Sequence, residues 1–348
     1  MWAVPAHGLK ILSIHPHGSR REALKAVGLN RATGLFLFRS FSTTFSASGT
    51  GGRKKYPALH FSLRFCYDRG GNKNAGRAKP FPVRQTEARM KILCVGDVVG
   101  TPGLDFLCRR LPGLKRRLSA DICIVNGENA HAGGVGVTRS IAEDIFAHGA
   151  DVITTGNHAL RRADEALYEE TEALLCPANL PHLAPGAGRV TLDLGRCALT
   201  VINLAGVAFL EPVDNPFDTA DRLLAGDAAR FRVVDIHAES TAEKQALAWY
   251  LDGRVSAVFG THTHVPTADA GVLPGGTGFI TDVGMTGPVR SVIGVRPELA
   301  VKKQRTHRPV RFEVADGPCR LDAVLFTCDD ASGRCLSAEA VREEEETR

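Results

Sequence analysis

From Met90 onward, short apolar runs rich in β-branched residues alternate with segments whose apolar residues have helical spacing. Three such runs are KILCVGDVVG, ADICIVNGENAHAGG and ADVITTGNHAL, and a segment with a helical pattern follows each of them. Alternation of strand and helix at roughly 30 residues per unit is typical of βαβ connections, which pack helices on a parallel or mixed sheet. We therefore expect an α/β protein over residues 90–341.

The remaining elements follow from the same patterns. Further strands are expected at ALTVINLAGV, RFRVVDIHAES and VSAVFGTHTH, and then at GFITDVGM, PVRFEVA and CRLDAVLFTCD with hairpin-like connections. Helices are expected over residues 102–118, between a cap at Thr138 and a stop at Gly149, in ADEALYEETEALL and around EKQALAWYL. The stretch FLEPVDNPFD is predicted to be a loop and residues 342–348 a charged tail.

Residues 1–89 differ from the rest of the chain in charge and in pattern. They hold 16 basic and 3 acidic residues, whereas residues 90–348 hold 27 basic and 35 acidic ones. Clusters of Ser, Thr and Gly without a sustained apolar period predict a basic, disordered extension. A start codon misassigned upstream of Met90 would explain it, and a nucleic-acid-binding arm that contacts phosphates is the alternative.

Cysteine usage and hydropathy limit the class of protein. The nine cysteines form no CxxC pair, and Cys94 and Cys123 lie inside apolar runs, as buried free thiols do. An odd number of cysteines without a secretory signal predicts a reducing, cytoplasmic location. No apolar stretch in the sequence is long enough to cross a bilayer. A disulfide scaffold and a membrane protein are therefore not expected.

Polar residues recur where the predicted strands end. Five of them follow five different apolar runs: Asp97, Glu128, Asn157, His237 and His262. Ligands of open α/β sheets bind beyond the carboxyl ends of the strands, so these side chains are expected at one edge. His264 is expected to join His262, because side chains two residues apart point to the same face of a strand. Each residue alone would suit a turn or a helix cap, and only their recurrence predicts a site.

The donor atoms indicate the kind of site. Carboxylates, an amide oxygen and imidazoles without a thiolate suit Mn²⁺, iron or Zn²⁺. Six or seven candidate ligands are too many for one tetrahedral ion, and they suit two ions about 3.5 to 4 Å apart. Such a pair activates a bridging hydroxide and neutralises a phosphoryl group, so the pattern predicts phosphoester hydrolysis.

Six short motifs resemble one known family. They are GDVVG (96–100), NGEN (126–129), GNH (156–158), DIHAE (235–239), GTHTH (260–264) and TDVGMTGP (281–288). Together they resemble the YmdB-like branch of the calcineurin-like metallophosphoesterases over residues 90–341. The resemblance implies a four-layer α/β/β/α sandwich with a dinuclear site and 2′,3′-cyclic-nucleotide 2′-phosphodiesterase activity.

The resemblance also implies roles for single residues. One ion would be held by Asp97, Glu128, Asn129 and His264, and the other by Glu128, Asn157, His237 and His262, with Glu128 as the bridge. His158 would be the general acid that protonates the leaving 2′-oxygen, which suits an imidazole that titrates near neutral pH. The alternative is that His158 only positions the phosphate.

Two features depart from the wider superfamily. Asp97 is followed by Val98 and Val99 where many metallophosphoesterases have a DxH pair, so Asn129 would fill the place of a histidine. After GNH the chain continues as ALRRADEAL, which leaves the substrate preference beside His158 open. Arg161 and Arg162 are expected to be exposed arginines, with phosphate contact as the alternative.

The expected partners follow from this assignment. They are a cyclic nucleotide as substrate, two divalent or iron-type ions (iron, manganese or zinc) and a second copy of the chain, without a membrane. Two alternatives stay open. One is a regulatory or RNA-interacting protein that keeps the metal fold as a scaffold. The other is a phosphatase that acts on other phosphoesters.

Overall fold

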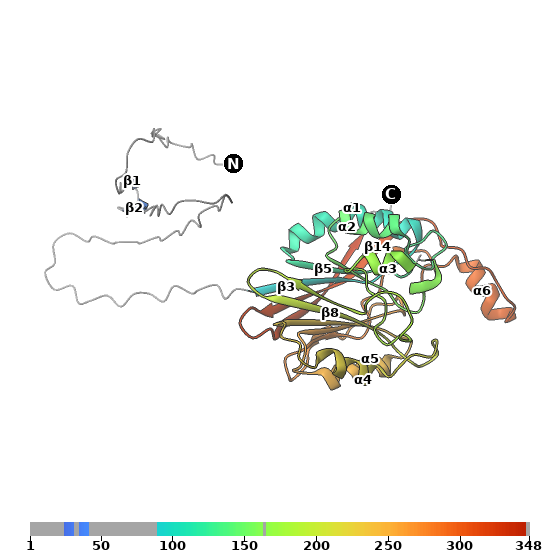
Figure 1. Ribbon diagram of the computed structural model, residues 1–348. Helices are drawn as coiled ribbons and strands as arrows, with labels where there is room; N and C mark the ends of the chain where they lie inside the picture. Colours follow the sequence, from blue (N-terminus) through green and yellow to red (C-terminus); the bar gives the residue numbers. More distant parts are fainter. Residues whose placement is uncertain (1–23, 31–34, 42–88, 163–164, 346–348) are drawn as a thin grey trace. The chain divides into compact units, whose positions relative to one another are not determined.

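The computed structural model describes residues 24–30, 35–41, 89–162 and 165–345 (Figure 1). Residues 1–83 and 84–348 form two separate units. In the first unit, β1 (Leu24–Asn30) and β2 (Leu35–Phe41) form an antiparallel hairpin. The prediction of a disordered extension otherwise falls on residues that lie outside the described part of the chain.

Seven strands of the second unit form one sheet. Its order is β4-β13-β14-β3-β5-β6, and β15 pairs with β14 outside this path. Strands β3, β5 and β6 are parallel, while β14 runs antiparallel to β3, β13 and β15. Their bounds are β3 (Arg89–Val95), β4 (Asp97–Val98), β5 (Ile122–Asn126), β6 (Val152–Thr154), β13 (Met285–Pro288), β14 (Cys319–Asp329) and β15 (Cys335–Glu344).

A second sheet has six strands in the order β11-β12-β10-β9-β8-β7. Its four central strands are parallel, and the two edge strands pair antiparallel to their neighbours. Their bounds are β7 (Arg189–Asp193), β8 (Ala198–Ala205), β9 (Phe231–His237), β10 (Ala257–Thr261), β11 (Gly271–Val272) and β12 (Gly278–Ile280). The fold is therefore mixed α/β with two sheets.

Helices cover the outer side of each sheet, and α6 (Pro297–Thr306) projects away from both (Figure 1). In Figure 1, α1 and α2 lie beside the seven-stranded sheet, whereas α4 and α5 lie beside the six-stranded sheet. Among the described residues, none of the helices combines the length and the apolar character that a bilayer crossing needs. The bounds are α1 (Gly100–Leu118), α2 (Arg139–Ala147), η1 (Ala159–Arg161), α3 (Glu165–Glu170), α4 (Pro216–Leu224), α5 (Thr241–Leu251) and α6 (Pro297–Thr306).

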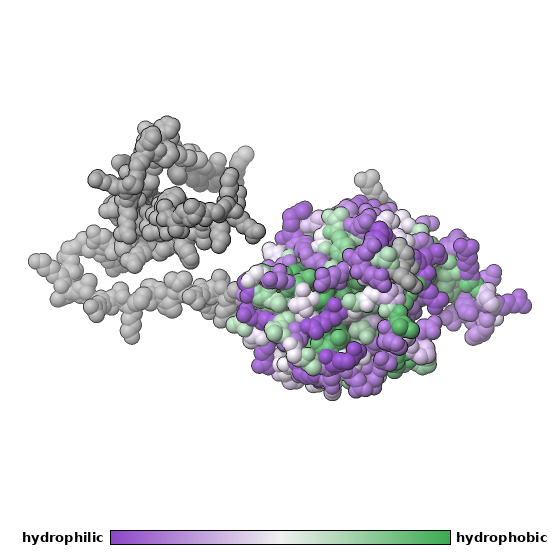
Figure 2. Space-filling model, viewed as in Figure 1, coloured by the Kyte–Doolittle hydropathy of each residue, from purple (hydrophilic) through white to green (hydrophobic). Residues whose placement is uncertain are grey.

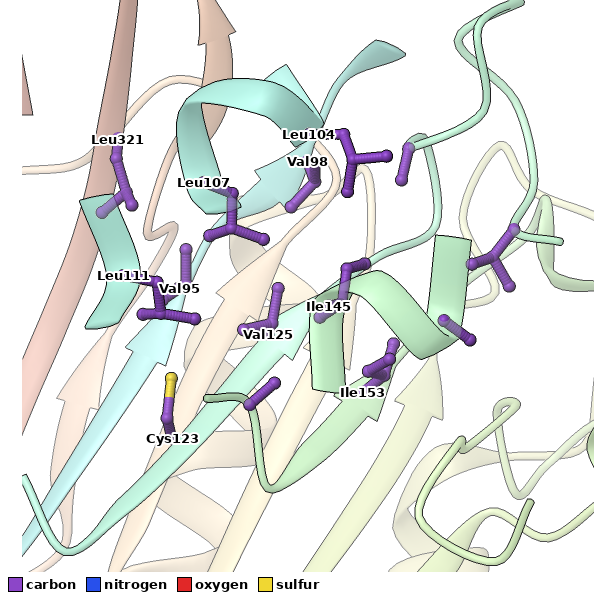
Figure 3. Packing of buried hydrophobic residues seen from close by; sticks show 14 of the residues in the cluster. Val95, Val98, Leu104, Leu107, Leu111, Cys123, Val125, Ile145, Ile153 and Leu321 are labelled. Atoms are coloured by element: carbon purple, nitrogen blue, oxygen red, sulfur yellow. The ribbon is translucent and has the colours of Figure 1, made fainter. Parts of the chain in front are cut away.

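The apolar runs of the sequence are strands that are buried on both faces. In β3, Leu93 and Val95 pack under α1, while Ile92 and Cys94 point to the opposite face and pack between the sheets. Figure 3 shows the first cluster, in which Leu107 and other α1 residues meet the strand side chains. Since successive side chains alternate between two buried faces, the strand is apolar throughout instead of alternating apolar and polar.

Two further clusters complete the interior. Between the sheets, Ile124 of β5 packs in the same cluster as Val233 and Phe259 of the six-stranded sheet. On the far face of that sheet, Val234 lies in a cluster with Leu247 of α5. The outer surface of the described residues in the view of Figure 2 is largely hydrophilic. The hydrophobic driving force therefore stacks the two sheets face to face and covers each with helices.

Several predicted elements differ from the structure. The helix predicted in ADEALYEETEALL is shorter, because α3 ends at Glu170 and Leu174 pairs with Ile153 in an isolated bridge. PVRFEVA forms no strand, and its only pairing among the described residues is an isolated bridge between Val295 and Val314. The stretch FLEPVDNPFD is only partly a loop, because Asn215 caps α4 and Pro216 begins it, with the Asn215 side chain accepting from the Phe217 N–H at 2.8 Å. The strand β15 continues to Glu344, inside the segment predicted to be a charged tail.

Candidate metal centre

The predicted ligands lie at strand ends of both sheets. Asp97 lies two residues after the end of β3 and opens β4, Glu128 follows β5, and Asn157 follows β6, all in the seven-stranded sheet. His237 ends β9 and His262 follows β10, both in the six-stranded sheet. The strand pattern predicts that they lie at one edge of one sheet, whereas the structure divides them between two sheets. They still meet, because the stacked sheets bring their carboxyl ends to the same side of the molecule.

Glu128 lies at the centre of the cluster. Its Oε1 is 3.1 Å from Nε2 of His237 and 3.0 Å from Nδ1 of His158, and its side chain is completely buried. The backbone N–H of His158 donates to Glu128 Oε2 at 3.3 Å. A Cβ on Gly156 would lie 2.0 Å from Cδ2 of His237 and 2.2 Å from Glu128 Oε2. Glycine is therefore needed beside Asn157, because any larger residue would displace the two side chains.

Asp97 and Asn129 connect His264 and His158 to this centre. Nε2 of His264 is 3.6 Å from Asp97 Oδ1 and 3.2 Å from Asn129 Nδ2. Asn129 Oδ1 lies 3.0 Å from Nδ1 of His158. On the other side of Glu128, Asn157 Oδ1 is 3.1 Å from Nε2 of His237. The structure thus brings together all seven predicted ligands and the predicted acid.

His262 and His264 reach the cluster by a different route from the predicted one. Strand β10 ends at Thr261, so the two histidines lie in a turn and not on one face of a strand. Their φ angles are 95° and 63°, in the left-handed region that residues with a side chain rarely adopt. Within this turn His262 approaches His237, with ring nitrogens 3.0 Å apart, while His264 approaches Asp97. The turn therefore sends the two rings to opposite ends of the cluster.

Each of the three histidines of the six-stranded sheet is held at its second ring nitrogen. Nδ1 of His237 is 3.0 Å from Thr261 Oγ1, Nε2 of His262 is 2.9 Å from Glu239 Oε2, and Nδ1 of His264 is 2.9 Å from the Ile293 carbonyl. Such partners fix the ring orientation and the tautomer of a metal-binding histidine. Sequence reasoning missed these partners, although Glu239 stands in the motif DIHAE two residues after His237.

A buried network supports Thr261. Its hydroxyl donates to Asp235 Oδ1 at 2.7 Å, and the other carboxylate oxygen accepts from Thr154 at 2.5 Å and from Asn126 at 3.1 Å. Burial raises the pKa of Asp235 to about 6, although these hydrogen bonds oppose the shift. The network joins β5, β6, β9 and β10, so it fixes the two sheets relative to each other directly beneath the cluster.

The charges of the cluster depend on one another. Burial would raise the pKa of the Glu128 carboxyl, but the rings of His237 and His158 hold that pKa far below its ordinary range. Burial would likewise raise the pKa of Asp97, which His264 and His237 keep below its ordinary value. Burial would lower the pKa of His237, but the Glu128 carboxylate raises it to about 9. For His262, burial and the nearby His237 lower the pKa to about 4.

The cluster fits a cation. Asp97 Oδ1 is buried and makes no hydrogen bond, which is costly for a carboxylate oxygen unless a cation supplies the missing interaction. Glu128 Oε1 is also buried, and the ring nitrogens of His237 and His158 lie 3.1 and 3.0 Å from it. One donor atom each of Glu128, His237 and His262 lies within 4.8 Å of the others. Oxygen and imidazole donors without a thiolate suit manganese, iron and zinc. The described residues could therefore hold at least one metal ion here.

Arg161 and Arg162 lie beside the cluster at the surface. Both side chains are exposed, as expected, and Arg161 lies 3.5 Å from Glu211 in an ion pair. An exposed pair of this kind contributes little to stability.

Comparisons with known proteins agree with this geometry. A family model described as YmdB-like protein matches residues 93–341. The chain is 45% identical over 255 residues to the 2′,3′-cyclic-nucleotide 2′-phosphodiesterase of Bacillus subtilis, covering 72% of this chain and 96% of that protein. A crystal structure of a novel phosphatase from Mycoplasma pneumoniae is 34% identical with a TM-score of 0.71, covering 75% of this chain and 95% of that one. A crystal structure of a hypothetical protein from Thermus thermophilus is 40% identical with a TM-score of 0.69, covering 74% of this chain and 100% of that one.

Proposed function

This chain belongs to the YmdB-like protein family, and we propose that it is a metal-dependent phosphodiesterase that hydrolyses 2′,3′-cyclic nucleotides to 3′-nucleotides. The name of the Bacillus subtilis relative supports the reaction, and the names of other relatives include phosphatase and phosphodiesterase. The observation that carries the proposal is the pair of buried carboxylates that face imidazole nitrogens: Asp97 Oδ1 makes no hydrogen bond and lies 3.6 Å from His264, and Glu128 Oε1 lies 3.1 Å from His237.

The domain assignment is part of the same proposal. Residues 90–341 would be the metallophosphoesterase domain, which β15 extends to Glu344, and residues 1–89 an extension outside it. The stacking of helices, sheet, sheet and helices supports a four-layer α/β/β/α sandwich of the calcineurin-like type.

Two ions, manganese or iron, would share the cluster. Asp97, Glu128, Asn129 and His264 would hold the first ion, and Glu128, Asn157, His237 and His262 the second. The division is supported by the turn that sends His264 toward Asp97 and His262 toward His237. When bound, the ions would lower the pKa of a shared water and offset the charge of the phosphate.

His158 would supply the proton for the leaving 2′-oxygen. Its ring is positioned by Asn129 and Glu128 through Nδ1, and its side chain is 29% exposed, so a bound substrate can reach it. A departing alkoxide needs a proton, and general acid catalysis of this kind contributes roughly 10²- to 10⁴-fold to the rate. The carboxylates and carboxamides of the cluster would not serve this purpose, because they would be occupied by the ions.

Turnover of 2′,3′-cyclic AMP by the full-length protein tests the proposal. The protein would be stripped of metal, refilled with Mn²⁺ or Fe²⁺, and compared with a His158→Ala variant and with a His182→Ala control, since His182 is exposed. We expect metal-dependent release of 3′-AMP, at least about 100-fold slower in the His158 variant and unchanged in the control. Absence of turnover with two bound metal equivalents would contradict the proposal and favour another phosphoester or a regulatory role.

The remaining expectations stay predictions. They are binding of RNA by the basic segment, association of two copies of the chain, and a cytoplasmic location.

A further inference from the structure

A cavity of about 290 Å³ opens directly beside the metal centre. Gly156 and Asn157 line it, and the same two residues pack against His237 in the cluster. We propose that this cavity binds the nucleobase of the cyclic nucleotide. This inference rests on the proposed phosphodiesterase function, because it assumes that the phosphate of the substrate lies at the cluster.

The walls of the cavity suit a flat aromatic base. They are mostly apolar and come from two sides: Ala159 and Leu160 follow His158 on η1, while Leu210 and Val213 lie on the loop after β8. Small-molecule sites combine apolar walls with a few polar groups that fix orientation. Here the polar groups are Arg161 and Glu211, which also line the cavity and form the ion pair between its two sides. They offer a donor and an acceptor to the edge of a base.

The size and position of the cavity agree with a single nucleoside. A volume of about 290 Å³ lies just below the range for small-molecule sites, which begins at about 300 Å³. The ribose of a 2′,3′-cyclic nucleotide joins the phosphate directly to the base. A phosphate at the cluster therefore brings the base to a cavity that begins at Asn157, whose Oδ1 lies 3.1 Å from His237.

The loop that forms the second wall is fixed at both ends. The backbone N–H groups of Val207 and Ala208 donate to Glu243 Oε1 at 2.8 and 3.1 Å. At the other end, the N–H of Asp214 donates to the Asn179 carbonyl at 2.9 Å, and the Asn179 side chain donates to the Asp214 carbonyl at 2.9 Å. The wall is thus formed before a ligand binds, which reduces the entropy cost of binding.

Apolar side chains are exposed around the cavity. Leu160 is 42% exposed, and Phe209, which directly precedes Leu210, is 92% exposed with a φ of 61°. Exposed apolar groups gathered beside a concave surface are typical of a ligand-binding site. A base in the cavity would cover part of this apolar surface.

Two substrates that differ only in the base test the inference. The full-length, metal-loaded protein would be assayed with 2′,3′-cyclic AMP and with 1-O-methyl-ribofuranoside 2′,3′-cyclic phosphate, which carries the same reacting group without a base. We expect kcat/KM to favour the nucleotide, and the ratio of the two values to fall roughly tenfold in Leu210→Ser, because a lost apolar pocket contact changes discrimination by this order. A Leu183→Ala control, at a site that is 85% exposed and outside the cavity, should keep the wild-type ratio.

The outcomes distinguish failure of the proposed base site from failure of the proposed reaction. Turnover of both substrates without a preference, or with a preference that Leu210→Ser leaves intact, would overturn the base site while the proposed reaction stands. If neither substrate is turned over, the proposed reaction fails. The base site is then tested by calorimetry, which compares the binding of adenosine 3′-monophosphate with that of ribose 3-phosphate. Tighter binding of the nucleotide that weakens in Leu210→Ser would support the base site, and equal binding would refute it.

Discussion

At the scale of single residues, the cluster is defined by how its imidazoles are held. His237 and His264 each direct one ring nitrogen toward a buried carboxylate, and His262 directs one toward His237. All three leave the other ring nitrogen to a fixed partner. A hydrogen bond at the second nitrogen fixes which nitrogen is free to bind a metal. For His262 that partner is Glu239, whose side chain is 51% exposed, so the orientation of this ring depends on a carboxylate at the surface.

Glu239→Gln is therefore expected to weaken metal binding without unfolding the protein. The substitution preserves the size of the side chain but removes its charge, and loss of such a partner typically lowers metal affinity about 10- to 100-fold. Isothermal titration calorimetry of the metal-free protein with Mn²⁺ measures the change in metal affinity. A Glu169→Gln variant on α3 is the control, since Glu169 is exposed. Equal Mn²⁺ affinity in both variants would show that Glu239 does not orient His262.

At the scale of elements, an ion pair fixes the turn that carries His262 and His264. Lys244 on α5 and Asp282, which follows β12, are fully buried, and Nζ lies 2.7 Å from Asp282 Oδ2. The same oxygen accepts from the backbone N–H of Thr263 at 3.2 Å and from its hydroxyl at 2.6 Å. Thr263 stands between the two histidines, so one carboxylate connects α5, the strand end and the metal centre.

Replacing Lys244 by Met should destabilise the protein strongly. Burial already raises the pKa of Asp282, which Lys244 partly offsets, and removal of one partner from a buried pair costs about 3–5 kcal/mol. The free energy of unfolding in urea measures this loss, and Mn²⁺ affinity should fall with it because Thr263 loses its fixed acceptor.

A lysine at the surface provides the comparison for this prediction. Lys302→Met on α6 changes an exposed side chain and should alter the unfolding free energy by no more than about 0.5 kcal/mol. A similar, small change in both variants would mean that the buried pair contributes little to the stability of the turn.

At the scale of the whole molecule, the candidate metal centre joins the two sheets. Its residues come from strand ends of both, and the network of Asp235 links the same strands beneath it. A cation bound to the buried carboxylates would interact with the folded state only, because the ligands come together only when the sheets stack. Metal binding should therefore stabilise the fold as a whole.

Removal of metal is expected to lower the melting temperature. At a free Mn²⁺ concentration 100 times the dissociation constant, binding stabilises the folded state by about 2.7 kcal/mol. Thermal unfolding of chelator-treated protein, with and without Mn²⁺, measures the difference, and a Glu128→Gln variant should show almost none of it. A melting temperature that does not respond to Mn²⁺ in the unsubstituted protein would argue against a metal site that spans the sheets.

Much of the fold could be predicted from local patterns. The strands β3, β5, β8, β9 and β10 and the helices α1, α2 and α5 were predicted near their observed positions, because burial on two faces makes a strand apolar throughout and burial on one face gives a helix its spacing. PVRFEVA was wrongly predicted to be a strand, because its apolar residues have β-like alternation but no neighbouring strand pairs with it. A short pattern does not specify a pairing partner.

The sequence by itself determined which residues are candidates for the metal centre. Polar side chains at the ends of apolar strands must lie at a sheet edge, so Asp97, Glu128 and His237 could be identified without coordinates. Only the tertiary structure decided that these edges belong to two stacked sheets, that His262 and His264 diverge from a left-handed turn, and that Glu239 holds one ring. The reason is physical: strand and helix patterns depend on neighbours along the chain, whereas the stacking of sheets and the direction of a turn depend on contacts between residues far apart in sequence.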